Sequence, residues 1–334
     1  MKIFPGDYEV GYKYLNGNYI VVQQQEVLQK IALRANEELV AKFPDSIDLK
    51  ISNHCSNGCP FCHENSTPNG ALLDIEKTTQ ILQQLPKLPI EIAIGGGNIL
   101  ENYEELGGFI SWLKERGHRL RCTLRLEDHM KVQDDEKLNK FLCNFGGIGL
   151  SITSSLSEEH RKLLKSKFEY LGEYAGIGKQ RRSSSIVLHV IAGITPVEDI
   201  KFLIEEVPFP VLILGYKQWG RASNNPIPDL KETERIIKNT IYRSRFTKDF
   251  EKIRCRNWHE GESKLVIAFD NLALDQLHIK EAVLEPEWES IYLGKEGKHS
   301  MYIDAVKGEY ARNSCSPDRV SWDSVPLLEY FRSL

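Results

Sequence analysis

Three of the seven cysteines, Cys55, Cys59 and Cys62, lie within eight residues of one another. Thiolates bind zinc and iron–sulfur clusters, and they are also the reactive groups of redox proteins. In a reducing compartment, such crowding indicates metal or redox chemistry rather than a disulfide framework. The three cysteines directly follow a β-like run at residues 47–52, where an α/β barrel places its active-site loops.

The spacing Cys-x3-Cys-x2-Cys has four interpretations. Structural zinc needs a fourth ligand, which His54 or His63 could supply, although no second ligand pair stands out farther along the chain. Cys59 to His63 matches a c-type haem motif, but haem attachment normally follows export. Cys59 and Cys62 also resemble a thioredoxin-type pair, which leaves Cys55 unexplained. The fourth interpretation is a [4Fe–4S] cluster held by three thiolates, with one iron open to another ligand.

With Phe61 before the last cysteine, the motif resembles the hallmark of the radical S-adenosylmethionine (radical SAM) superfamily. A second match follows the second predicted strand, where the family places a glycine-rich segment beside the methionine end of SAM. The resemblance assigns SAM contacts there to Gly95, Gly96, Gly97 and Asn98, although the family often has Glu-Pro after its glycines. An ordinary strand-to-helix turn explains this segment equally well.

Further SAM contacts are predicted on later strands. The segment 190–198, which includes Ile191, resembles the family's fifth-strand segment beside the adenine. On the third strand, apolar residues alternate with arginines, and Arg125 lies nearest the carboxyl end. Arg125 is therefore a candidate for binding a SAM or substrate carboxylate, unless this strand is simply solvated. Ser151 and Thr153 on the fourth strand are candidate partners for the SAM hydroxyls.

The elements that must position these residues form a regular series. Six β-like runs alternate with segments of helical spacing, and they occupy residues 47–52, 90–95, 120–126, 147–153, 186–192 and 211–215. This predicts an α/β fold, a partial (β/α)6 TIM-like barrel, because six units are too few for the closed eight-fold barrel. A short N-terminal preface and an α+β C-terminal extension complete the chain.

The predicted domains are residues 1–46, 47–222 and 223–334. The first contains a hairpin around Asn16-Gly17 and an amphipathic helix with Val27, Leu28, Ile31, Ala35 and Leu39 on one side. The second is the radical SAM core. The third has a helix at residues 232–253 and strands near residues 264–269 and 301–305, on the substrate side. It contains only Cys255 and Cys315, too few to bind a second cluster alone.

Composition and charge indicate which partners and which compartment to expect. The net charge of −4 gives no strong signal for nucleic-acid binding, and no run approaches the about twenty apolar residues of a membrane span. Residues 1–19 carry Asp7, Glu9 and Lys13 and lack the apolar core of a signal peptide, so we expect a cytoplasmic protein.

The resemblance implies an oxidoreductase-like radical SAM enzyme with a [4Fe–4S] cluster and S-adenosyl-L-methionine as cofactors. Such an enzyme cleaves SAM reductively to a 5′-deoxyadenosyl radical, which abstracts hydrogen from a substrate. It implies an electron donor such as flavodoxin or ferredoxin. The substrate is unidentified: a peptide, a nucleoside or a small metabolite. The alternatives are a thiol–disulfide redox protein using Cys59 and Cys62, and a non-catalytic zinc or iron–sulfur binding module.

Overall fold

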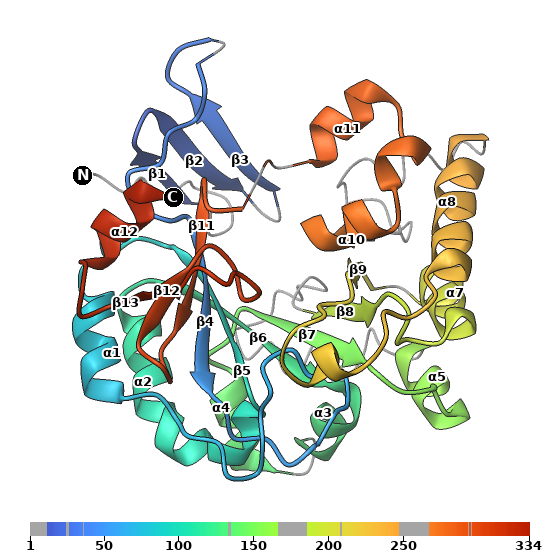
Figure 1. Ribbon diagram of the computed structural model, residues 1–334, viewed down its shortest axis with the longest axis horizontal. Coiled ribbons are helices and arrows are strands. Elements are labelled where there is room, and N and C mark those ends of the chain that lie inside the picture. Colours follow the sequence, from blue (N-terminus) through green and yellow to red (C-terminus); the bar gives the residue numbers. More distant parts are fainter. Residues whose placement is uncertain are drawn as a thin grey trace. The chain divides into compact units, whose positions relative to one another are not determined.

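The computed structural model describes residues 12–24, 27–35, 37–132, 135–165, 186–207, 209–246, 267–292, 294 and 296–334. The chain divides into two compact units, Met1–Cys122 with Lys295–Leu334, and Thr123–Gly294. Both contain parallel strands connected by helices (Figure 1). None of the helices in the described part is long and apolar enough to cross a membrane.

The first unit begins with the predicted hairpin, which is confirmed. Strand β1 (Tyr12–Asn16) pairs antiparallel with β2 (Tyr19–Gln24). Gly17 begins the connecting turn with a φ of 62°, a left-handed value that glycine adopts without steric cost.

The predicted helix through Val27, Leu28 and Ile31 is wrong. Residues Val27–Ala32 instead form strand β3, which pairs antiparallel with β2. Apolar residues three and four apart suggested a helical stripe, but Ile31 is 50% exposed and faces no core. The exposed edge of β2 satisfies the backbone of this short segment, and its β-branched residues suit a strand.

A parallel sheet follows in the first unit. Strands β4 (Ser46–Ser52), β5 (Glu91–Gly96) and β6 (Arg119–Arg125) are parallel neighbours, and the boundary between the units falls within β6, after Cys122. On the other side of β4 lies the late strand β11 (Ser300–Asp304), also parallel to it, so the order is β6-β5-β4-β11-β12-β13 (Figure 1). The remaining elements are β12 (Glu309–Ala311), β13 (Val320–Ser321), α1 (Ile75–Leu82), the 3-10 helix η1 (Ile99–Asn102), α2 (Tyr103–Glu115) and α12 (Leu327–Ser333).

The second unit repeats the parallel pattern, with neighbouring strands in the order β10-β9-β8-β7. The strands are β7 (Gly147–Ile152), β8 (Ile186–Ile191), β9 (Val211–Leu214) and β10 (Ile267–Phe269). The helices are α3 (Leu126–Val132), α4 (Glu136–Leu142), α5 (Glu158–Lys165), α7 (Val197–Glu206), α8 (Lys231–Phe246), α10 (Asn271–Gln276) and α11 (Glu285–Ile291), with η3 (Gly220–Asn224) and η5 (Ile279–Ala282).

All six predicted core strands are confirmed to within one or two residues, and so are the later strands β10 and β11. Residues 247–253 and 264–266 of the predicted C-terminal elements lie outside the described residues. The alternation on β6 is confirmed, because Leu120, Cys122 and Leu124 are buried while Arg119, Arg121, Thr123 and Arg125 are not. The three-domain division stays a prediction.

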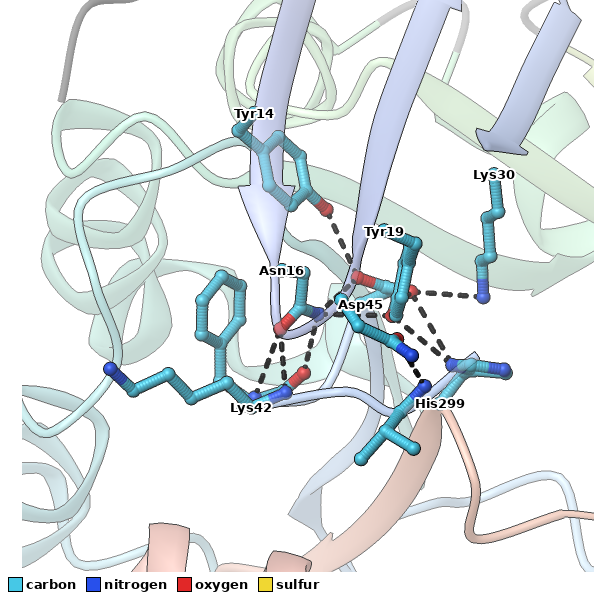
Figure 2. Close-up of polar contacts among 10 residues, drawn as sticks. Tyr14, Asn16, Tyr19, Lys30, Lys42, Asp45 and His299 are labelled. Carbon is cyan, nitrogen blue, oxygen red and sulfur yellow. Dashed lines mark hydrogen bonds and ion pairs between the residues drawn. The ribbon is translucent and has the colours of Figure 1, made fainter. Parts of the chain in front are cut away.

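The three-stranded sheet is attached to the amino ends of β4 and β11 through one buried carboxylate, Asp45. Figure 2 shows Tyr14 and Asn16 of β1 and Tyr19 of β2 pointing at it. The Tyr19 hydroxyl donates at 2.6 Å and the Asn16 amide at 2.7 Å, and Lys30 of β3 lies 2.9 Å from the same carboxylate. We call Asp45 with these four residues and His299 the amino-end cluster. His299 precedes β11 and lies 3.1 Å from the Tyr19 hydroxyl.

Candidate functional site

The cysteines lie on a loop that returns along the end of β4. In this cysteine loop, residues 53–72, the Cys55 amide donates to the Thr67 carbonyl at 2.9 Å. The Thr67 amide donates to the Asn53 carbonyl at 2.9 Å, and Asn53 in turn donates to Ala71 at 2.8 Å. Backbone hydrogen bonds between the two ends of the loop therefore fix the chain on either side of the first cysteine.

Cys55, Cys59 and Cys62 are all half-buried, which leaves their thiols within reach of a ligand. The Cys62 amide donates to the Cys59 carbonyl at 3.2 Å, so a tight turn joins these two residues. Burial raises the pKa of the Cys55 thiol, and the nearby Glu101 carboxylate and Cys62 act in the same direction. A bound metal ion would have to displace this proton, because thiolate is the form that ligates.

The donor set fits an iron–sulfur cluster. No disulfide joins any cysteine in the described ranges, and all three thiols belong to one short loop. In those ranges, no three or more His, Cys, Asp or Glu side chains are close enough together to bind one metal ion. The thiolates that hold a four-iron cluster need not converge on one ion, since each binds a different iron.

The glycine-rich end of β5 packs against the cysteine segment. The Gly97 amide donates to the Ser52 carbonyl at 2.7 Å, and the Asn98 amide donates to the His54 carbonyl at 2.9 Å. A Cβ atom on Gly96 or Gly97 would come within 2.2 Å of one of these same carbonyl oxygens. Close backbone approach therefore explains the absence of side chains at both positions, while a Cβ on Gly95 would meet only open space.

Glu101 joins these two segments. Its carboxylate accepts from the Ser56 hydroxyl at 2.8 Å and from the Asn98 side-chain amide at 3.0 Å, and it lies 3.2 Å from the His54 ring. The side-chain oxygen of Asn98, Oδ1, caps η1 by accepting from the Leu100 amide. The structure thus brings Asn98 beside the cysteine loop, with both ends of its side chain engaged within the protein.

The predicted SAM contacts fall into two groups. Phe61, Gly95, Gly96, Gly97 and Asn98 belong to the first unit with the cysteines, and Phe61 is half-buried on the loop itself. Arg125, Ser151, Thr153 and Ile191 belong to the second unit. Their assignment to SAM stays a prediction.

Within the second unit, two of these residues, Arg125 and Ile191, have partners in the structure. The Arg125 guanidinium lies 3.3 Å from the Glu127 carboxylate. The Ile191 amide donates to the Thr195 hydroxyl, which itself donates to the Ile152 carbonyl at 2.6 Å. This side chain connects the carboxyl ends of β7 and β8, the two strands that carry Ser151 and Ile191.

Sequence reasoning missed two charged residues at the cysteine loop. Lys50 of β4 is 4% exposed and lies beside the loop, and Glu64 lies on it, two residues after the last cysteine. Lys50 pairs there with Glu64 and with Asp304 of β11, which is 2% exposed. A signal existed for Lys50, because it interrupts the apolar residues of a strand expected to be buried. No local pattern pointed to Glu64.

Comparisons with known proteins support the fold. No family model and no curated protein matches the chain. Among solved structures, Streptococcus suis SuiB bound to S-adenosylmethionine matches with a TM-score of 0.55 and 16% identity, over 88% of this chain and 66% of that one. SuiB bound to its precursor peptide SuiA matches with a TM-score of 0.54 and 14% identity, over 88% and 65%.

A third match, to coproporphyrinogen III oxidase (HemN) from Escherichia coli, described as a radical SAM enzyme, has a TM-score of 0.38 and 14% identity over 68% of this chain and 63% of that one. The chain spans 66% and 65% of the two SuiB chains, just under two thirds of their length. The SuiB matches confirm the predicted α/β fold, a partial TIM-like barrel.

Proposed function

We propose that this chain is a radical SAM enzyme with a [4Fe–4S] cluster on Cys55, Cys59 and Cys62. One observation carries the proposal: three thiols follow β4 on a loop that is hydrogen-bonded to the glycine-rich end of β5. The carboxyl end of parallel strands is where barrel enzymes place their chemistry. The similarity of the fold to SAM-bound SuiB supports the choice of SAM as the second cofactor.

When bound, the cluster and SAM would supply reductive cleavage of SAM to methionine and a 5′-deoxyadenosyl radical that abstracts hydrogen. The residues of the chain hold and shield this chemistry. Cys55, Cys59 and Cys62 would ligate three irons, and Glu101 holds the loop carrying the first cysteine against Asn98. Gly95, the one glycine of this segment with open space beside it, is the favoured place for close approach of SAM to the backbone.

The substrate class is proposed from the comparison with SuiB. A peptide is the first class to test, because the similar SuiB structure was determined with a precursor peptide. Nucleosides and small metabolites are the next classes to test, since one fold serves many substrates. Flavodoxin or ferredoxin is the proposed electron donor, and the cytoplasm is the proposed compartment.

The test is SAM cleavage by protein reconstituted with iron and sulfide under anaerobic conditions. With SAM and dithionite, the wild-type protein should release 5′-deoxyadenosine, and the Cys55→Ser variant should release none. Cys122→Ser is the matched control, because Cys122 is buried within β6 and lies outside the motif. A thiol–disulfide enzyme would instead retain activity in Cys55→Ser and would not need iron. Stoichiometric zinc without iron uptake would contradict the proposal.

A further inference from the structure

A second buried cluster of charges lies at the carboxyl ends of β4 and β11, beside the cysteine loop. Lys50 and Asp304 are register partners on these parallel strands, and the ammonium group lies 3.2 Å from the Asp304 carboxylate. The same ammonium lies 2.8 Å from Glu64, which is 11% exposed and follows Cys62 by two residues. We call Lys50, Glu64, Tyr302 and Asp304 the carboxyl-end cluster.

Glu64 is the member that belongs to the loop, and it has the most partners. The Tyr302 hydroxyl lies 3.2 Å from both of its carboxylate oxygens, and the His63 ring lies 3.4 Å away. The Glu64 carboxylate is therefore held from three sides, by the Lys50 ammonium, the Tyr302 hydroxyl and the His63 ring.

Asp304 serves a different purpose in the same cluster. One of its oxygens accepts from the amides of Val306 and Lys307, which form the turn after β11. The other oxygen faces Lys50. This arrangement fixes the lysine between two carboxylates, and a buried lysine without such partners would be strongly destabilising. The C-terminal strand thereby determines where the Lys50 ammonium can hold Glu64.

The loop is thus attached at both ends of its cysteine motif. Near Cys55, backbone hydrogen bonds and Glu101 hold it to the loop's return, to the residues that follow β5 and to η1. Near Cys62, the chain makes a turn in which the Asn65 amide donates to the Cys62 carbonyl at 3.4 Å. Glu64 lies within this turn, and its ion pair with Lys50 attaches this second end to β4 and β11.

We propose that Asp304 and Lys50 are positioning residues for the iron–sulfur cluster, acting through Glu64 on the loop that carries Cys62. This inference rests on the proposed function, and it makes strand β11 of the C-terminal extension part of the cluster site. Groups that orient metal ligands commonly change metal retention about 10- to 100-fold when removed. Neutralising Asp304 should therefore weaken retention of the cluster without removing any ligand.

The test measures the rate at which reconstituted protein without SAM loses iron to an excess of a chelator. Asp304→Asn should lose iron about tenfold faster than wild type, and Glu64→Gln should lose it at least as fast. Because removing both carboxylates would leave Lys50 unpaired, the combined change is made together with Lys50→Met, and this triple variant should lose iron no faster than Glu64→Gln, since all three changes act on the same attachment. Asp45→Asn is the control: it neutralises a buried carboxylate at the other end of the same strands, so it lowers stability but should leave the rate unchanged.

Tyr302→Phe removes only a hydroxyl and keeps the ring, so it serves if Asp304→Asn fails to fold. It should release iron several-fold faster than wild type, and the electron paramagnetic resonance spectrum of its reduced cluster should be altered. A wild-type rate in folded Asp304→Asn or Tyr302→Phe overturns this inference and leaves the proposed function standing. An equal acceleration in Asp45→Asn also overturns it, because general destabilisation would then explain the effect. Failure of wild-type protein to take up iron would contradict the proposed function itself.

Discussion

Strands β4 and β11 carry a buried polar cluster at each end, and the two clusters are built differently. At the amino end, Asp45 is surrounded mostly by neutral donors, namely two tyrosines and an asparagine, with Lys30 as the one cation (Figure 2). At the carboxyl end, Lys50 is paired with two carboxylates. The first attaches one sheet to another, and the second attaches a loop that carries candidate metal ligands.

This difference follows the general division of parallel barrels, in which residues at the amino ends of strands serve stability and residues at the carboxyl ends serve function. When the donors around a single carboxylate are neutral, removing one of them leaves no other buried charge without a partner. Paired charges depend on one another, because removing one leaves the rest uncompensated. The two ends should therefore respond differently to single substitutions.

The largest effect should come from Lys50→Met, which leaves Glu64 and Asp304 buried without their shared cation. We expect the apo protein to lose about 3–5 kcal/mol of unfolding free energy. Urea denaturation followed by circular dichroism measures this. A triple variant in which Glu64→Gln and Asp304→Asn accompany Lys50→Met should recover much of the loss. A loss below about 1 kcal/mol in the single variant would show that the lysine is not buried among these charges.

The second-largest effect should be a loss of unfolding free energy in acid, and it should come from a residue at the amino end of β6. His118 precedes β6, is 4% exposed, and its Nδ1–H donates to the Leu88 carbonyl at 2.9 Å. Burial lowers its pKa from 6.5 to about 4, with Arg116 acting the same way. The unfolded chain therefore binds the proton first, so stability is complete above pH 6.5 and falls as the pH drops toward about 4, by at most about 3 kcal/mol.

His118→Gln keeps a donor for the Leu88 carbonyl but has no ring to protonate. Its unfolding free energy should fall less than that of wild type between pH 6.5 and pH 4, in the same urea assay. His278, which is 58% exposed, provides the control: His278→Gln should follow the wild-type pH dependence. Identical curves for wild type and His118→Gln would assign the acid sensitivity to other groups.

Asp45→Asn should have an intermediate effect at the amino end. The amide keeps the shape of the carboxylate, but its nitrogen cannot accept from the tyrosine hydroxyls, and Lys30 loses its counter-charge. We expect a loss of about 2 kcal/mol in unfolding free energy, with iron retention unchanged. If Asp45→Asn lost iron faster than wild type, the two clusters would not have the separate roles assigned to them.

The smallest change is Tyr19→Phe, which removes one hydroxyl that donates to Asp45 at 2.6 Å. The carboxylate keeps its other donors, so the loss should be about 1 kcal/mol. Tyr242→Phe, at a side chain that is 44% exposed, should cost much less and serves as the reference. Differential scanning calorimetry of the two variants side by side checks this ranking.

The sequence predicted the parts of the molecule that depend on local pattern. Buried parallel strands are often nearly continuous apolar runs, which is why β9 could be located from its residues alone. Strand β4 could be located from the alternation of its apolar and polar residues. The error at residues 27–32 arose because a six-residue segment with mixed polarity suits either period, and pairing with β2 decided the outcome. Cys55, Cys59 and Cys62 could be selected because their spacing is itself the signal.

The carboxyl-end cluster could not be predicted in this way. Tyr302 and Glu64 are 238 residues apart in sequence, and they meet because β11 returns to pair with β4. Neither residue belongs to a motif, and a polar residue at a strand end is common. The interruption of β4 by Lys50 could have been noticed, and it would have indicated a buried charge without identifying its partners.

The most direct test of the account is electron paramagnetic resonance of the reconstituted, dithionite-reduced protein, recorded with and without SAM. The account predicts the signal of a reduced [4Fe–4S] cluster whose shape changes when SAM is added, because three cysteine ligands leave one iron open. The signal should be absent from Cys55→Ser. A cluster signal that SAM leaves unchanged, or a protein that binds only zinc, would contradict the account.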